Sequence, residues 1–154
     1  MKERVILNYA EMQGYYTELK APFTSPANMV KISQHYTKIY STGTASNSDE
    51  RLMLLREKLQ MGNPVIIDAI ARLFDPTSGA HFILVTGISV SPDNKYAIMI
   101  YYNDPLTGNN RSSPWFGEEG IWNAWNHNGD PGGSGWWLSF PPPAVLTTMY
   151  FTPM

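Results

Sequence analysis

Two apolar runs of strand character, joined by a short turn, constrain the fold of this chain more than any other feature. The first run covers residues 81–90 and the second covers residues 96–102. Residues 91–94 between them read Ser-Pro-Asp-Asn, which is typical of a hairpin turn. Because the strands of a hairpin run in opposite directions, the sequence predicts an antiparallel sheet in this half of the chain.

The first part of the chain carries helical periodicity instead. Apolar side chains recur at spacings of three and four over residues 5–19, 26–40 and 48–61. The Ser-Pro pair at residues 25–26 predicts an N-cap and the first position of the second helix. Gly62 predicts the end of the third helix, because glycine adopts the left-handed capping conformation at low cost.

This order of elements predicts the fold class. The other expected elements are a polar loop at 41–47, a buried strand at 64–70, a polar loop at 106–114, a short helix at 118–126, a glycine-rich loop at 126–135 and a last strand at 145–151. Helices followed by strands predict an α+β fold with a twisted antiparallel sheet. We expect a single domain over residues 1–154, with a helical part at 1–62 and a sheet part at 63–154.

Composition excludes several classes of function. The net charge is −2 over 154 residues, so the chain lacks the basic surface that nucleic-acid binding requires. No apolar run reaches the roughly 18 residues that a membrane span needs. The chain has no cysteine, which rules out disulfides, thiolate metal sites and a thiol nucleophile within these residues. We therefore expect neither nucleic acid nor a membrane span to be involved in its function.

A histidine and an aspartate mark one end of the expected hairpin. His81 opens the first strand and Asp104 follows the second, within an Asn-Asp-Pro sequence that is also an ordinary turn. A histidine that only bonds to backbone explains His81 about as well as a functional one. The hairpin nevertheless brings His81 to the same end as Asn103 and Asp104. A carboxylate or amide there can accept a hydrogen bond from the imidazole Nδ1–H, which fixes the tautomer and leaves Nε2 for proton transfer.

The two remaining histidines carry weaker signals. His35 stands among polar residues of the second expected helix, which is typical of a solvated face. His127 lies in the glycine-rich loop, and its spacing from His81 and Asp104 matches no metal motif. We therefore expect no metal site.

Tryptophan is concentrated in one part of the chain, since all five tryptophans of the sequence fall within residues 115–137. Trp122 and Trp125 stand at helical spacing, which favours packing against the sheet. Trp136 and Trp137 follow the glycine-rich loop, where adjacent rings are more easily exposed. They are therefore candidates for a wall that binds an extended peptide or a sugar.

The order of several short motifs resembles that of papain-like cysteine peptidases of bacteria. The motifs are Gly62-Asn63-Pro64-Val65-Ile66, Ala80-His81-Phe82 running to Thr86-Gly87, Asn103-Asp104-Pro105 with Gly108, and then Trp122 or Trp125. The nearest resemblance is to the bacteriocin-processing (double-glycine) peptidase-like group. The papain-type effector proteases of plant-pathogenic bacteria come second. The resemblance covers roughly residues 50–126 and is carried by the combination of motifs.

This resemblance implies a reaction and the roles of two residues. It implies Cys-His-Asp hydrolysis of peptide bonds in a peptide or protein substrate, with His81 as general base, Asp104 as its orienter and no cofactor. The family nucleophile is a cysteine at the start of a helix, and residues 5–9 (Val-Ile-Leu-Asn-Tyr) resemble the later part of that helix. The cysteine is thus expected just before Met1, in a segment that this chain lacks. A weaker alignment puts Ala21 at the nucleophile position.

Two other functions stay open at this stage. One is a catalytically inactive papain-fold module that binds a peptide or protein partner beside Trp136 and Trp137. The other is a domain that binds cell-wall glycans, which only the tryptophan density suggests. If a segment is missing, the sheet face that it covers favours self-association or pairing with that segment. A bacterial origin is implied by the resemblance alone, with secretion or export as an effector left open.

Overall fold

The computed structural model of the chain describes residues 13, 25–70, 80–91, 93, 97–104, 108–126 and 132–141. The helices in these ranges are α2 (Pro26–Tyr36), α3 (Ser48–Gln60) and α4 (Ile121–Asn126). The strands are β1 (Ser41–Thr44), β2 (Val65–Ile70), β3 (Ala80–Val90), β4 (Ile98–Asp104), β5 (Asn109–Pro114) and β6 (Trp136–Ser139). Apart from Gln13, the expected helix at 5–19 lies outside the described residues, as does the expected strand at 145–151. No helix in the described ranges is long and apolar enough to cross a bilayer.

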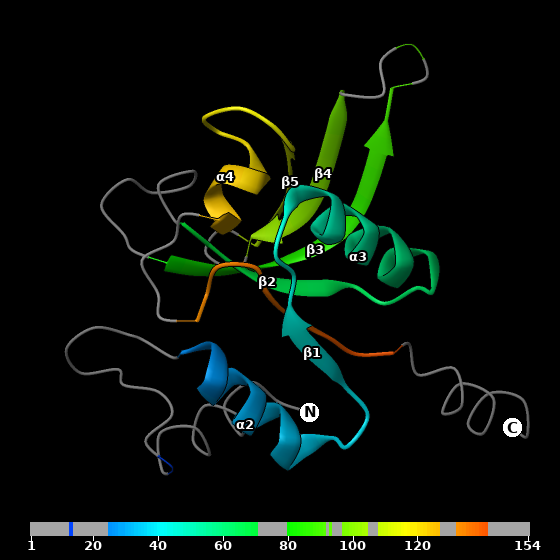
Figure 1. The fold of residues 1–154 in the computed structure, drawn as a ribbon. Coiled ribbons are helices and arrows are strands. Elements are labelled where there is room, and N and C mark those ends of the chain that lie inside the picture. The colour runs from blue at the N-terminus through cyan, green and yellow to red at the C-terminus, as the bar shows by residue number, and fades with distance from the viewer. Residues whose placement is uncertain are drawn as a thin grey trace, which may run out of the picture.

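The strands form a single antiparallel sheet in the order β1-β6-β2-β3-β4-β5 (Figure 1). The expected hairpin is confirmed, because β3 pairs with β4 from Val90 opposite Ile98 to Leu84 opposite Asn103. β2 pairs with β3 on its other side, as the apolar pattern of residues 64–70 allows. Together with the helices, this sheet confirms the α+β prediction.

The helix ends agree with the local sequence signals. The Ser25 side chain accepts a hydrogen bond from the backbone N–H of Asn28 at 3.1 Å, which makes it the N-cap of α2. The Asn47 side chain caps α3 in the same way, accepting from the Glu50 N–H at 2.9 Å. Gly62 follows α3 with φ of 81°, the left-handed conformation expected there.

Two segments expected to be loops are strands. Residues 41–44, with the sequence Ser-Thr-Gly-Thr, form β1 because β6 pairs with them through the whole of their length. Residues 109–114 form β5, a polar edge strand that pairs with β4. Neither segment alternates apolar and polar side chains, and both are strands only because a distant segment supplies the hydrogen-bond partners. The helix expected to reach Tyr40 also ends earlier, and Ile39 beyond it is 68% exposed.

The hydrophobic core lies between one face of the sheet and the helices α3 and α4. Figure 1 shows α3 and α4 on one side of the strands and α2 on the other. The fully buried members include Leu55 of α3, Val65 and Ile67 of β2, and Trp125 of α4. Trp122 is partly buried against the same cluster, so the packing role expected for Trp122 and Trp125 is confirmed. This face of the sheet also carries the candidate site.

Candidate active site

His81 and Asp104 meet on the core-facing side of the sheet. His81 stands opposite Ala69 in the β2–β3 ladder, and directly paired residues project to the same face of an antiparallel sheet. Asp104 ends β4 on that same face, in line with the buried side chains of Ile100 and Tyr102. The two side chains therefore approach each other diagonally across β3 and β4, as the hairpin predicts.

The contact between them is short, and one partner is wholly buried. The imidazole Nε2 of His81 lies 2.8 Å from Oδ1 of Asp104. The Asp104 side chain has no exposed surface, whereas 13% of the His81 side chain is exposed. The nitrogen differs from the expected one, since Nε2 rather than Nδ1 faces the carboxylate. Spacing along the strands brings the residues together, but the side-chain rotamer decides which nitrogen points inward.

Arg111 is a third member of this site, and the sequence did not single it out. It lies on β5 opposite Tyr102, and its Nη1 is 3.4 Å from Oδ2 of Asp104. Residues 106–114 were expected to be a polar loop, and a loop predicts no strand partner for Asp104. The sequence signal for a partner is Gly108, because glycine favours a turn. In the structure Gly108 has φ of 70°, and its N–H donates to the Asp104 carbonyl at 2.7 Å. A strand after that turn necessarily runs back beside β4.

The charges of the site account for the burial of Asp104. A buried carboxylate is unfavourable unless it is hydrogen-bonded or paired with a cation. Here one oxygen contacts His81 and the other contacts Arg111. Such an arrangement orients an imidazole and keeps it in one tautomer.

Other expected site residues lie elsewhere. His35 is exposed on α2, which confirms its place on a solvated face, and His127 lies outside the described residues. Among the described residues, no group of three or more His, Cys, Asp or Glu side chains is placed to hold a metal ion.

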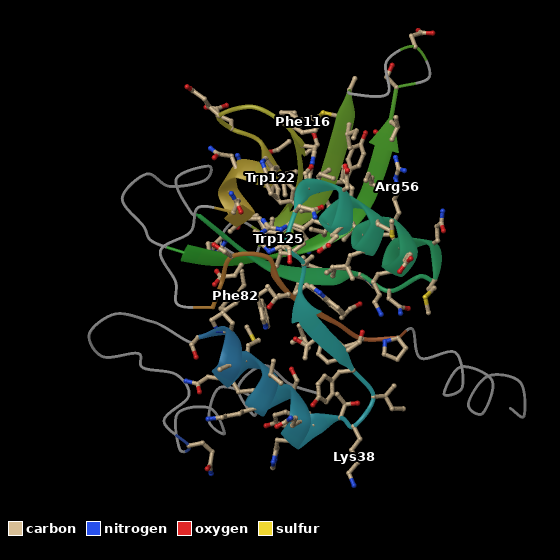
Figure 2. The ribbon with its side chains drawn as sticks, viewed as in Figure 1. Lys38, Arg56, Phe82, Phe116, Trp122 and Trp125 are labelled. Atoms are coloured by element: carbon tan, nitrogen blue, oxygen red, sulfur yellow. The ribbon has the colours of Figure 1, made fainter. Side chains whose placement is uncertain are left out.

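Trp136 and Trp137 lie in the strand β6 and not in a loop. Trp136 is 6% exposed, and its ring meets that of Phe82 edge to face at 5.7 Å between centroids. Figure 2 shows Phe82 on the side of the sheet towards α2, away from Trp125. Trp137 stands opposite Ile67 and so shares the face of His81, half-buried, with the Lys58 Nζ 5.2 Å from its ring centroid. Their role in binding a substrate stays a prediction.

A second buried charge lies in α3, at a residue that the sequence analysis did not single out. Arg51 of α3 is 2% exposed, and its Nε donates to the Ala45 carbonyl at 2.9 Å. Its Nη2 donates to the Asn126 side chain at 3.2 Å, and its guanidinium lies 4.5 Å from the ring centroid of Trp122 and 5.2 Å from that of Trp125. Burial lowers the pKa of Arg51 from its ordinary value. The contacts join α3 to α4 and form part of the framework.

Comparison with known proteins identifies a family for this chain. The model of the Peptidase_C39 like family matches residues 6–130, well over half of the chain. The curated proteins and the solved structures give no match. The matched range contains both His81 and Asp104, on an α+β fold of the papain-like kind. The chain therefore belongs to the Peptidase_C39 like family.

Proposed function

We propose that this chain carries the general base and its orienting carboxylate for cysteine-peptidase hydrolysis of peptide bonds, and that the thiol comes from outside the 154 residues. The observation that supports the proposal best is the 2.8 Å contact between His81 Nε2 and the buried Asp104. It occurs in a chain that matches a peptidase family and contains no cysteine of its own.

In this proposal His81 moves a proton twice. Its Nδ1 takes the proton from the thiol, the thiolate attacks the peptide carbonyl carbon, and the C–N bond then breaks. The imidazolium returns the proton to the leaving amine, and water later hydrolyses the thioester. Asp104 keeps the ring oriented through Nε2 and stabilises the imidazolium while it exists. The 154-residue chain alone is expected to hydrolyse no peptide, because it has no nucleophile.

The substrate is proposed only as an extended peptide. Trp137 is the better placed of the two tryptophan candidates, because it shares the sheet face of His81, whereas Trp136 packs on Phe82. Cleavage after a double-glycine sequence is the narrower proposal and depends on the motif resemblance alone.

The test is labelling of the native gene product by a peptide that carries a thiol-directed electrophile. We expect one cysteine of the native gene product to be labelled. This labelling should be lost in its His81→Ala variant. His35→Ala is the matched control, because His35 is an exposed histidine on α2. A native protein without any cysteine, or a labelling rate that His81→Ala leaves unchanged, would contradict the proposal.

The lack of cysteine also favours a second candidate, a non-catalytic module that binds a peptide or a protein partner. This candidate predicts that peptides change the tryptophan fluorescence of the 154-residue chain and that Trp137→Phe weakens the change. It also predicts that added upstream sequence gives no hydrolysis. Co-sedimentation with cell-wall glycans would detect glycan binding. Sedimentation velocity of the chain alone would detect self-association, and both are distinct from peptide binding.

A further inference from the structure

We infer that Arg111 is a positioning residue that keeps Asp104 ionised and turned towards His81, so that the three side chains act as one unit. The catalytic meaning of this unit rests on the proposed function. Its effect on the imidazole, however, is a property of the 154-residue chain and can be measured without a nucleophile.

The three side chains come from three neighbouring strands. His81 lies on β3, Asp104 on β4 and Arg111 on β5, in the order in which these strands pair. Arg111 is opposite Tyr102, two residues before Asp104, so its side chain reaches Asp104 along the diagonal of the ladder. All three therefore share the core-facing side of the sheet.

The carboxylate divides its oxygens between the two partners. Oδ1 lies 2.8 Å from His81 Nε2, and Oδ2 lies 3.4 Å from Arg111 Nη1. A carboxylate held at both oxygens cannot rotate without breaking one contact. Arg111 thus fixes the direction in which Oδ1 faces the imidazole.

Arg111 also balances the buried charge of Asp104. Asp104 has no exposed surface, so its negative charge needs a cation nearby. Arg111 is a permanent cation, so the pair that it forms with the Asp104 carboxylate carries no net charge. Without Arg111 the buried negative charge would favour a second proton on His81, the most basic neighbour. Asp68, an acid of the neighbouring strand β2, stands opposite Phe82 and points to the other face of the sheet.

Solvent already reaches the Arg111 side chain, which is 39% exposed. Water can therefore fill the space that a shorter side chain leaves, and the cost of the change falls on the buried Asp104 carboxylate, which keeps its contact with His81.

The experiment compares the imidazole nitrogens of His81 by ¹⁵N spectroscopy in four forms of the chain at neutral pH: parent, Arg111→Gln, Arg111→Lys and Arg56→Gln. Arg56 is the matched control, an exposed arginine of α3 on another part of the surface (Figure 2). We expect Arg111→Gln to raise the ratio of doubly to singly protonated His81 by a factor on the order of ten, because a competing cation is lost. Arg111→Lys keeps the charge and should resemble the parent.

The outcomes separate this inference from the proposed function. His81 signals that are the same in Arg111→Gln and the parent would overturn the inference and leave the peptidase proposal standing. An Arg111→Gln chain that fails to fold would also overturn it, since Arg111 would then be a structural residue. The expected shift, found together with no thiol labelling of the native protein, would keep Arg111 as a positioning residue and remove the peptidase proposal.

Discussion

Among the buried charged side chains of the described residues, two that lie in different regions are satisfied in different ways. At the end of β3 and β4, Asp104 is shared between an imidazole and a guanidinium. At the junction of α3 and α4, Arg51 is held by carbonyl and amide oxygens and by two tryptophan rings. The first region contains a proton that can move between groups near neutral pH, whereas a guanidinium surrounded by neutral oxygens cannot exchange one. Chemistry is therefore expected in the first region and rigidity in the second.

The pKa of Arg51 supports this division. Burial lowers the pKa of Arg51 from its ordinary value. The pKa of Arg51 is therefore lower in the folded state than in the unfolded state, so the folded state binds fewer protons only at strongly alkaline pH. In that range the free energy of unfolding rises with pH. Around neutral pH both states hold the proton, so Arg51 adds no slope to the pH dependence of stability.

The largest effect is expected from Arg51→Met, which keeps the side-chain length but removes every donor. The buried Ala45 carbonyl and the Asn126 amide oxygen would lose their partner, at about 3 kcal/mol of unfolding free energy in total. Chemical denaturation of Arg51→Met and of Arg56→Met, an exposed position on the same helix, measures the difference. Equal stability of the two variants would contradict a framework role for Arg51. The loss in Arg51→Met should also be the same across neutral pH.

A pair of glycines offers a second test of the packing around Arg51. Gly135 and Gly132 both have positive φ, of 73° and 76°, so alanine strains the backbone equally at both. A Cβ on Gly135 would lie 2.2 Å from the Ala45 carbonyl oxygen and 2.8 Å from Arg51 Nη2, whereas a Cβ on Gly132 meets nothing within 4 Å. We expect Gly135→Ala to be less stable than Gly132→Ala by about 2 kcal/mol, from overpacking around Arg51. Equal melting temperatures would show that Arg51 is not tightly held.

Asp104→Asn tests the other region. The amide keeps the shape of the carboxylate and removes the charge that His81 and Arg111 share, at an expected cost of about 1 to 2 kcal/mol. Because Arg111 is partly exposed, solvent takes over part of its interaction and limits the loss. Asp93→Asn, at an exposed position, is the control in thermal unfolding. In the native protein the same change should also slow thiol labelling, and an unchanged rate would argue against Asp104 as orienter.

The smallest effect on stability is expected from His81→Ala. The imidazole is partly exposed, and Asp104 keeps Arg111, so the loss should stay below about 1 kcal/mol. His35→Ala should be within about 0.5 kcal/mol of the parent. A much larger loss of unfolding free energy in His81→Ala, measured by chemical denaturation, would place His81 with Arg51 in the framework. That result would contradict the difference between the two regions.

Local signals predicted those parts of the fold that depend on neighbours in sequence. The hairpin, the N-cap Ser25 and the positive φ of Gly62 are of this kind, and the hairpin alone brought His81 and Asp104 together. The strand β1 depends on pairing with β6 almost one hundred residues away, which no local propensity records.

Local signals also failed to predict two buried or site residues whose environment depends on distant segments. Arg111 was missed because β5 is polar and becomes a strand only beside β4. Arg51 was missed because a charged residue on a helix usually faces solvent, and its burial depends on tryptophans from a distant helix.

In the proposed reaction His81 holds its proton on Nε2, against Asp104, and uses Nδ1 as the base. The most direct measurement is a long-range ¹H–¹⁵N correlation spectrum of the imidazole ring, in the 154-residue chain at mildly alkaline pH. We expect one tautomer, with the proton on Nε2 and an unprotonated Nδ1. A proton on Nδ1, or signals that average over both tautomers, would contradict it.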